Sequence, residues 1–338
     1  MIIATEIPGR LIWPMITLVL MNRGDYNSPQ LPMKTTRRHF IRSAALTGAG
    51  CLISSGIPSK LSAQMSRSQM NSEYKARGGP VRHSVMGWCF NPMPTAELIR
   101  NGKAMGLEGI EGISQSSYQE AMDAGLKISL VSGGHGFREG PCNPEFHDKV
   151  VQGLRSSIET ASDIGAKNVI TFTGMRYESM DDEKAAQRCV ETWKEVLPLA
   201  ESKGITLVLE HLNSRDGSHP MKGHPGYFGD DVDFCVEMIN QIGSNHFKLL
   251  FDVYHVSVMN GDVIRRIRRY HPLIGHYHTA GNPGRGELDQ TQEINYPAVV
   301  HEILKTGYQG FLAHEFIPTW DDPMASLRHG IQVCDLEG

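Results

Sequence analysis

The segment Thr206-Leu207-Val208-Leu209-Glu210-His211-Leu212 is a short apolar run that ends in a carboxylate and an imidazole. The same arrangement, an apolar run with an acid or a histidine near its end, recurs at 248–255, 274–280 and 310–316. Longer stretches with apolar residues at helical spacing separate these runs. Short apolar strands that alternate with helices are typical of a parallel sheet, so we expect parallel strands whose carboxyl ends carry polar side chains.

The alternation extends back to residue 82 and predicts eight strands. They are Arg82–Phe90, Gly109–Ile113, Lys127–Ser132, Asn168–Gly174, Thr206–Leu212, Lys248–His255, Ile274–Ala280 and Gly310–Phe316. Eight strand–helix units are the number that closes a (β/α)₈ barrel, and residues 64–338 are close to its usual length of ~250 residues. We therefore predict a single-domain TIM barrel of the α/β class over this range.

One helix between the strands is clear from its periodicity. Its apolar positions, which share one helical face, are Phe146, Val150, Leu154, Ile158, Ala161 and Ile164. Asn143-Pro144-Glu145 precedes this helix as a cap, and Gly165 stands where it should end. Gly243 is expected to end a later helix in the same way.

The composition is that of an ordinary globular protein, with 40% hydrophobic and 21% charged residues. Lys and Arg number 33 and Asp and Glu 37, so the formal net charge is −4 and nothing favours nucleic acid or an anionic membrane as a partner. A small-molecule substrate is the expected partner, and a homo-oligomer is compatible with the chain. The six cysteines form no C-x-x-C pair, which argues against a zinc knuckle or a disulfide framework, although an exported protein could hold one disulfide.

The amino-terminal residues differ from the rest of the chain. Thr36-Arg37-Arg38-His39-Phe40 precedes a weakly apolar stretch, 43–53, that is rich in Gly and Ala. This pattern resembles a twin-arginine export signal, with a short basic amphipathic helix as the alternative. We therefore predict a signal peptide at 33–63 and an exported, periplasmic protein.

Met33 stands directly before the arginine pair, where such a signal normally begins. We predict that translation starts there and that residues 1–32 are an upstream extension. The apolar run Leu11–Met21 is about half of the ~20 residues that a membrane helix needs, so no membrane span is expected in the mature protein.

Polar groups at the carboxyl ends of four consecutive strands could form one site, because active sites of parallel barrels lie at those ends. Glu210, Asp252 and Glu315 sit in apolar runs, where an ionised carboxylate is costly unless it is paired or bound to a metal. The seventh strand adds His276 and His278. Three carboxylates with one imidazole favour Mn²⁺ or Mg²⁺ and are compatible with Co²⁺ or Zn²⁺. The alternative is a set of isolated ion pairs with Arg or Lys.

Strand periodicity separates the neighbouring histidines. If Glu210 points into the site, His211 points toward the helices and is structural. His276 and His278 share one face, and His276 lies deeper, where packing or support of a ligand is its expected role.

The stretch Leu209–Pro318 closely resembles the hydroxypyruvate isomerase family, within the xylose-isomerase-like TIM barrels that include the ketose 3-epimerases. The matching pieces are Leu209-Glu210-His211-Leu212-Asn213, His224-Pro225-Gly226-Tyr227-Phe228, Phe251-Asp252-Val253-Tyr254-His255, Ile274 to Arg285, Glu293-Ile294-Asn295-Tyr296, and Gly307-Tyr308 through Glu315. The resemblance is dense over roughly a third of the chain, and the first four strands match in outline.

The resemblance implies one divalent metal ion, with Glu210, Asp252, His278 and Glu315 as ligands. It also implies that Glu210 and Glu315 are the two acid/base residues. Hydroxypyruvate isomerases often carry Gln where this chain has His278, whereas the epimerases carry His, so the resemblance implies the metal and leaves both substrate classes open.

Four further residues are candidate substrate contacts. His255 resembles the residue that contacts a substrate oxygen in the family. Arg285 could clamp a carboxylate or a hydroxyl group with its planar fork. Glu111, at the end of the second strand, could contact substrate or form a structural ion pair. His135 lies in a glycine-flanked loop after the third strand and could also contact substrate.

These parts suit an isomerase that works through an enediolate, with hydroxypyruvate and tartronate semialdehyde as the expected pair. The nearest alternative is a ketose 3-epimerase, or another sugar or cyclitol isomerase, epimerase or dehydratase, on the same barrel. A metal-dependent endonuclease would need more metal-binding histidines and a basic face. An exported, non-catalytic sugar-binding barrel would not need both Glu210 and Glu315.

Overall fold

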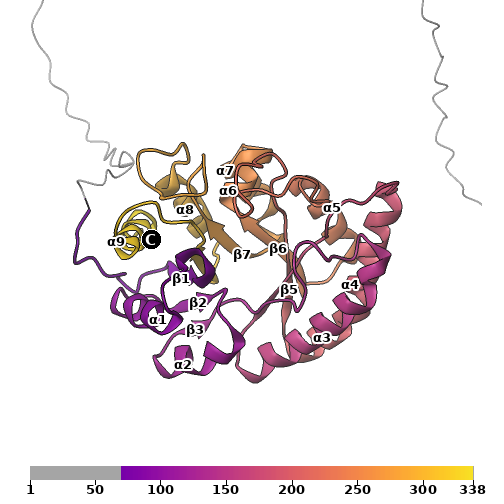
Figure 1. Cartoon of the computed structure of the whole chain (residues 1–338), viewed down its shortest axis with the longest axis horizontal. Helices are drawn as coiled ribbons and strands as arrows, with labels where there is room; N and C mark the ends of the chain where they lie inside the picture. The colour runs from indigo at the N-terminus through magenta and orange to yellow at the C-terminus, as the bar shows by residue number, and fades with distance from the viewer. Residues whose placement is uncertain (1–69, 338) are drawn as a thin grey trace, which may run out of the picture. The chain divides into compact units, whose positions relative to one another are not determined.

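Eight parallel strands form the centre of the computed structural model, which describes residues 70–337 (Figure 1). They are β1 (Arg82–Met86), β2 (Gly109–Glu111), β3 (Lys127–Ile128), β4 (Asn168–Thr171), β5 (Thr206–Glu210), β6 (Phe247–Asp252), β7 (Ile274–Thr279) and β8 (Phe311–His314). Their order is β3-β2-β1-β8-β7-β6-β5-β4. An isolated parallel bridge between Val131, in the segment after β3, and Val169 of β4 links the two edges of the sheet, as in the predicted barrel.

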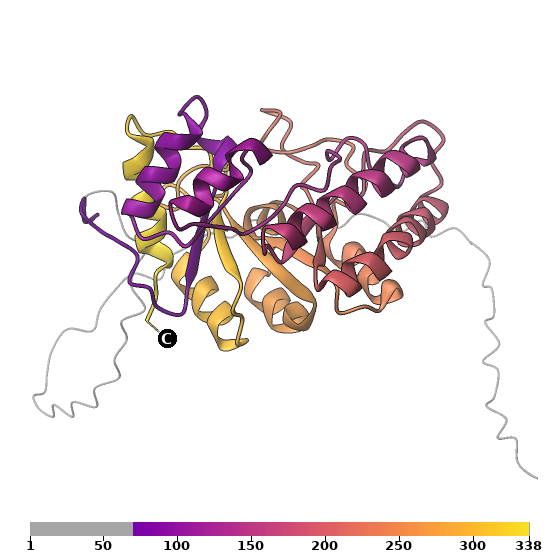
Figure 2. The same ribbon diagram turned by 90° about the horizontal axis from the view of Figure 1, so that it is seen from below.

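Helices surround the strands, as Figures 1 and 2 show. They are α1 (Thr95–Ala104), α2 (Tyr118–Asp123), α3 (His147–Asp163), α4 (Asp182–Lys203), α5 (Val232–Ile242), α6 (Val253–Met259), α7 (Val263–Tyr270), α8 (Tyr296–Lys305) and α9 (Pro323–Cys334). The predicted helical face is buried in α3, and Asn143 accepts a hydrogen bond from the Glu145 N–H ahead of it. Gly165 and Gly243 follow their helices with φ of 72° and 70°, a conformation that glycine adopts without steric cost.

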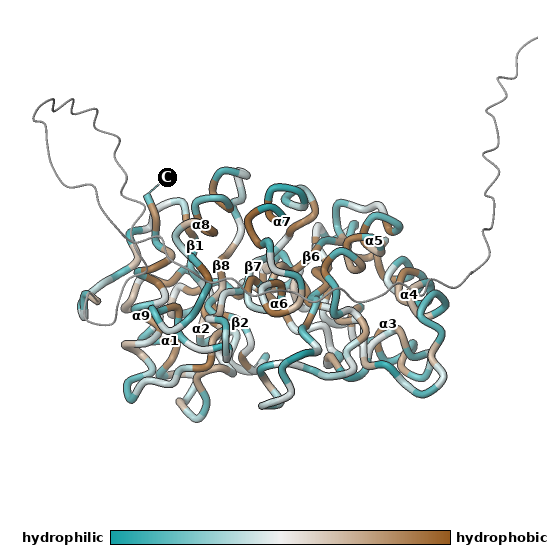
Figure 3. Tube along the Cα trace, turned by 90° about the horizontal axis from the view of Figure 1, so that it is seen from above, coloured by the Kyte–Doolittle hydropathy of each residue, from teal (hydrophilic) through white to brown (hydrophobic). Residues whose placement is uncertain are grey.

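The apolar core has an inner and an outer part. Leu130, Ile170, Val208 and Leu250 form a small cluster inside the barrel. Alternate residues of the same strands, such as Leu207 and Leu209, belong to the large cluster between strands and helices. Figure 3 shows apolar residues along the central strands and hydrophilic residues on many peripheral loops.

All eight strands are shorter in the structure than predicted; the third, for example, ends at Ile128 rather than at Ser132. The first ends at Met86, where a 3₁₀ turn (Gly87–Phe90) follows it. The sixth was expected to reach His255 but ends at Asp252, and α6 begins at Val253. The cause is the Asp252 carboxylate, which accepts hydrogen bonds from the backbone N–H groups of Tyr254 and His255 and so caps the helix.

Several predictions concern residues 1–69, which lie outside the described part of the chain. The extension at 1–32, the start at Met33 and the signal peptide at 33–63 therefore remain predictions. Within residues 70–337, none of the helices is both long and apolar enough to cross a bilayer. The five cysteines in this range are buried and free: Cys89, Cys142, Cys189, Cys235 and Cys334.

Candidate active site

Four of the predicted residues converge at the carboxyl ends of four neighbouring strands. Glu210 ends β5, Asp252 ends β6, His278 lies near the end of β7, and Glu315 follows β8. The strand register places Asp252 directly opposite His278. One ligand atom from each residue lies within 4.8 Å of the other three, and each residue is at most 4% exposed. The structure thus brings together the whole predicted ligand set.

Two cationic groups lie among these carboxylates. His278 Nδ1 is 2.6 Å from Glu315 Oε2 and 3.1 Å from Glu210 Oε1. Arg285 Nη2 is 2.7 Å from Glu315 Oε2 and 3.5 Å from Asp252 Oδ2. Burial is costly for charges unless they are paired, so the five side chains form one electrostatic unit.

The same arrangement separates the proton affinities of the two glutamates. Burial, together with the charge of Glu315, raises the pKa of Glu210 to about 7. Burial also acts on Glu315, but the charges of Arg285 and His278 outweigh it and lower the pKa of that carboxyl to about 2. Burial raises the pKa of Asp252 to about 6, although Arg285 opposes the rise.

The donor set fits a divalent cation. Burial favours a neutral His278, but the charge of Glu315 and the hydrogen bonds that the ring donates to Glu111 and Glu210 raise its pKa well above the usual value. The ring therefore holds a proton on Nδ1 unless a cation replaces it. Asp252 Oδ2 is buried and accepts no hydrogen bond from the described residues. Three carboxylates and one imidazole nitrogen are ligands that Mn²⁺, Mg²⁺ or Zn²⁺ accepts.

His255 lies on α6, beside Asp252, with its ring fully buried. Its Nδ1 accepts hydrogen bonds from the backbone N–H of Asn213 at 3.0 Å and from Asn213 Nδ2 at 2.7 Å. Burial lowers the pKa of His255 well below the usual value, so the ring is neutral and its hydrogen is on Nε2. Nε2 lies 3.6 Å from Asp252 Oδ2, which places this donor at the edge of the cluster.

Arg285 lies between the cluster and the cavity at the barrel mouth. Its Nη1 donates to the Met221 carbonyl at 2.6 Å, and its guanidinium lies over the rings of Trp88 and Tyr254 at 5.3 and 5.9 Å. The cavity, of about 360 Å³, is lined by Trp88, Cys89, Asn91, His219, Met221 and Ile317. Arg285 is therefore placed to contact a molecule that enters from this side.

The other two candidate substrate contacts have different surroundings. Glu111 is fully buried inside the barrel, and its carboxylate is bonded to His276, His278 and Ser129. His135 is 5% exposed, and its Nε2 lies 3.0 Å from Thr171 Oγ1 on β4. The structure places neither of them in the four-residue cluster.

The two supporting histidines lie on opposite sides of the strands. His276 shares the inner face with His278, and the rings meet edge to face at 5.2 Å. His211 is buried on the outer side against Phe251, as strand periodicity predicts.

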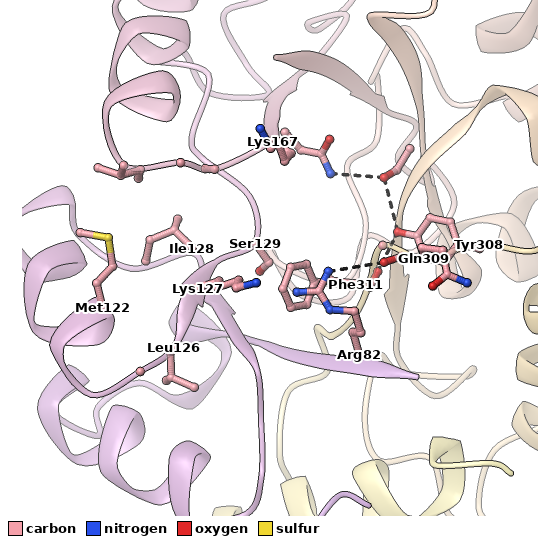
Figure 4. Close-up of a pocket in the computed structure, with 17 residues that line it drawn as sticks. Arg82, Met122, Leu126, Lys127, Ile128, Ser129, Lys167, Tyr308, Gln309 and Phe311 are labelled. Atoms are coloured by element: carbon pink, nitrogen blue, oxygen red, sulfur yellow. Dashed lines mark hydrogen bonds between the residues drawn. The ribbon is translucent and has the colours of Figure 1, made fainter. Parts of the chain in front are cut away.

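A larger cavity, of about 710 Å³, lies at the opposite end of the barrel (Figure 4). The first residues of four strands line it: Arg82, Lys127, Asn168 and Phe311. None of the four converging residues takes part in its lining. The four converging residues lie at the other, carboxyl end of the strands, where active sites of parallel barrels lie, and Arg285 connects them to the smaller cavity through its contacts with Met221 and Trp88.

Sequence reasoning assigned no role to Asn213, Trp88, Met221 or Tyr254. Asn213 was visible as the polar residue three positions after Glu210, and a strand-end pattern could have marked it. Trp88 and Met221 come from loops far apart in sequence, and no local signal identifies them.

Comparisons with known proteins agree with this geometry. A family model described as xylose isomerase-like TIM barrel matches residues 99–335. Hydroxypyruvate isomerase of Escherichia coli K12 is 26% identical over 190 residues, which are 54% of this chain and 70% of that protein. 2-oxo-tetronate isomerase of Cupriavidus necator is 29% identical over 162 residues, which are 48% of this chain and 59% of that protein.

Among solved structures, the apo form of 3-keto-D-glucoside 4-epimerase from E. coli superposes with a TM-score of 0.63. It is 18% identical and covers 75% of this chain and 98% of its own, a likeness of fold alone. The family model spans most of the described barrel, including all four converging residues. The chain therefore belongs to the xylose isomerase-like TIM barrel family.

Proposed function

We propose that this chain is an isomerase that uses one divalent metal ion to interconvert hydroxypyruvate and tartronate semialdehyde. The isomerase class rests on the family and on relatives named hydroxypyruvate isomerase and 2-oxo-tetronate isomerase. One observation carries the metal-dependent part. It is the convergence of four buried ligand atoms, from Glu210, Asp252, His278 and Glu315, within 4.8 Å of one another.

The reaction moves a proton from the hydroxymethyl carbon of hydroxypyruvate to the neighbouring carbonyl carbon through an enediolate. A bound divalent cation supplies positive charge that stabilises the enediolate oxygens. Glu210 and Glu315 carry the proton: one carboxylate removes it from the first carbon, and the other carboxyl group returns a proton to the second. Their surroundings differ, because burial and the charge of Glu315 raise the pKa of Glu210 whereas Arg285 and His278 lower that of Glu315.

Arg285 and His255 are the proposed substrate contacts. The Nε–H of Arg285 is buried and has no hydrogen-bond partner among the described residues, so it can donate to a substrate carboxylate. Cation–π contacts with Trp88 and Tyr254 help to hold the guanidinium in place. His255 can donate its Nε2–H to a substrate oxygen, because Asn213 occupies the other ring nitrogen.

A ketose 3-epimerase, or another sugar or cyclitol isomerase, epimerase or dehydratase, is the second candidate. The residue that favours it is His278, at the position where the isomerases often carry Gln. In an epimerase, Glu210 and Glu315 would act on opposite faces of one carbon. The mouth cavity of about 360 Å³ is within the range of small-molecule pockets and admits both substrate classes.

A proton-exchange assay in heavy water distinguishes these candidates. The purified protein, loaded with Mn²⁺ or Mg²⁺, is incubated with hydroxypyruvate, tartronate semialdehyde, fructose and psicose, and deuterium uptake at each carbon is followed by NMR. We expect deuterium at C3 of hydroxypyruvate and at C2 of tartronate semialdehyde. Exchange confined to C3 of a ketose would replace the first candidate by the second, and absence of exchange with every compound would refute both.

Glu315→Gln tests the mechanism. We expect turnover to fall by roughly 10²- to 10⁴-fold, the usual contribution of a positioned acid or base. Glu287→Gln is a matched control, because Glu287 is also buried but accepts its hydrogen bonds from Thr319 and Trp320, in the loop before α9, and from Ser326 on α9. Full activity of Glu315→Gln would remove Glu315 from the mechanism.

We also propose that the protein is exported in folded form by the twin-arginine pathway and acts in the periplasm. The basis is the Arg37-Arg38 pair and the apolar stretch that follows it. Cell fractionation of the wild type and of the Arg37→Lys, Arg38→Lys double variant tests this. Equal cytoplasmic retention of both proteins would contradict it.

A further inference from the structure

Glu111 is a carboxylate buried deep in the barrel, and three side chains donate to it. His278 Nε2 lies 2.8 Å from Oε1, His276 Nε2 lies 3.0 Å from Oε2, and Ser129 Oγ donates to Oε2 at 2.5 Å. Hydrogen bonds of this kind are what stabilise an ionised carboxylate away from water. All three partners are protein groups, and both carboxylate oxygens of Glu111 are engaged by them.

The contact with His278 decides which nitrogen of that ring faces the cluster. Because Nε2–H donates to Glu111, Nδ1 points toward Glu210 and Glu315, at 3.1 and 2.6 Å. If the ring were rotated by 180° about the Cβ–Cγ bond, carbon atoms would take the places of both nitrogens. A histidine that binds a metal commonly donates its other N–H to a carboxylate, which fixes its tautomer and strengthens it as a ligand.

Glu111 is itself held from two sides. Ser129 follows β3, and its hydroxyl also lies 2.6 Å from Ser84 Oγ on β1. His276 is on β7, two positions before His278, and its ring is fully buried. Three strands, β1, β2 and β7, and the segment after β3 therefore contribute to one hydrogen-bonded unit beneath the cluster.

We propose that Glu111 is a positioning residue that fixes the ring orientation and tautomer of His278, with Ser129 and His276 holding Glu111 in place. This inference rests on the proposed metal-dependent function. It replaces the expectation that Glu111 contacts substrate. It is also distinct from a second metal site built from Glu111, His276 and His278, and the stoichiometry of Mn²⁺ binding separates the two.

Mn²⁺ binding to the full chain tests the proposal without reference to activity. Free Mn²⁺ is measured by electron paramagnetic resonance during titration of the wild type, Glu111→Gln and Glu287→Gln. The amide of Glu111→Gln can accept from only one of the two histidines, so we expect affinity to fall by roughly 10- to 100-fold. Glu287→Gln removes the charge from another buried carboxylate that does not touch His278, and it should bind as the wild type does.

Stoichiometry and circular dichroism make the outcomes distinct. We expect one Mn²⁺ per chain in the wild type and a native spectrum for both variants. A folded Glu111→Gln variant with wild-type affinity would overturn this inference and leave the proposed function standing. Two ions per wild-type chain and one in Glu111→Gln would also overturn it, because Glu111 would then be a ligand. A wild type that binds no divalent ion would refute the proposed function together with the inference.

A second measurement needs no variant and covers the case in which Glu111→Gln does not fold. Nitrogen-15 NMR of the Zn²⁺-loaded wild type, labelled at histidine, reports which ring nitrogen carries hydrogen. We expect His278 to retain a slowly exchanging Nε2–H, as a bond to a buried carboxylate requires. A ring with its hydrogen on Nδ1 and the metal on Nε2 would overturn the proposal.

Discussion

Metal binding at the four-residue cluster should depend steeply on pH, because a cation binds only to the ionised carboxylates. Burial and the charge of Glu315 raise the pKa of Glu210 to about 7, and burial raises that of Asp252 to about 6. Both groups are ionised at pH 8. At pH 5 both are protonated, so a cation must displace two protons, and a third from His278, whose pKa is also raised.

The size of the effect follows from these values. Each pH unit below a pKa costs about 1.4 kcal/mol, or a factor of ~10, in the population of the ionised form. Lowering the pH from 8 to 5 should therefore weaken binding by ~100-fold through Glu210 and by ~10-fold through Asp252. Together they give a loss on the order of 10³-fold, or about 4 kcal/mol, before any contribution from His278.

Calorimetric titration with Mn²⁺ at four pH values, in two buffers of different ionisation enthalpy, measures both affinity and proton release. At pH 5 at least two protons should leave per ion bound. Glu210→Gln should lose one of these protons and flatten the profile, whereas Glu287→Gln should retain the wild-type slope. An affinity that is unchanged between pH 5 and 8, or proton release near zero, would refute the electrostatic account of the site.

Three other changes have defined outcomes. Arg285→Lys keeps the charge but loses the fork and the stacking on Trp88, so KM for a carboxylate substrate should rise at least ~10-fold in steady-state kinetics. Leu154→Ala, at a fully buried position of α3, should cost about 2–5 kcal/mol in urea unfolding and leave Mn²⁺ affinity unchanged. Burial raises the pKa of Asp335, but hydrogen bonds from His83 and from the Arg77 N–H outweigh burial and lower it. The ionised Asp335 therefore stabilises the fold at pH values above the unfolded pKa of ~3.9. That stability is lost as pH falls below this value, and Asp335→Asn should flatten the acid limb of a thermal-melting profile.

The strand-end pattern made much of the barrel and of the cluster predictable. A carboxylate such as Glu210 at the end of an apolar strand implies a partner or a cation, because burial alone would be too costly. The same feature on successive strands, which lie side by side in a parallel barrel, implies that the groups meet. Asp252 and His278 meet for this reason, one directly opposite the other.

The boundary between β6 and α6 was harder to predict from the sequence. Val253, Tyr254 and His255 are β-branched or aromatic residues, which favour a strand when read locally. The Asp252 carboxylate overrides this preference by capping a helix, with hydrogen bonds of 2.7 and 3.2 Å. Local propensity carries no information on whether an acid at a strand end also begins a helix, and here the two roles coincide in one residue.

Contacts across the barrel interior could not be predicted from which strands are neighbours. These contacts determine the surroundings of Glu111. β1 and β8 separate β2 from β7, so the bonds from Glu111 to His276 and His278 form only when the sheet closes.

Closure also divides the interior into two halves. An apolar cluster comes from β4, β5, β6 and the segment after β3, whereas Glu111, Ser129, Ser84 and His276 occupy the side of β1, β2 and β7. A polar interior is less favourable than an apolar one unless its members are satisfied, and His276 Nδ1 has no hydrogen-bond partner among the described residues. Leucines in the same positions would therefore stabilise the fold about as well as these polar side chains do. What it provides is a fixed orientation for the ring of His278, which an apolar surface could not hold.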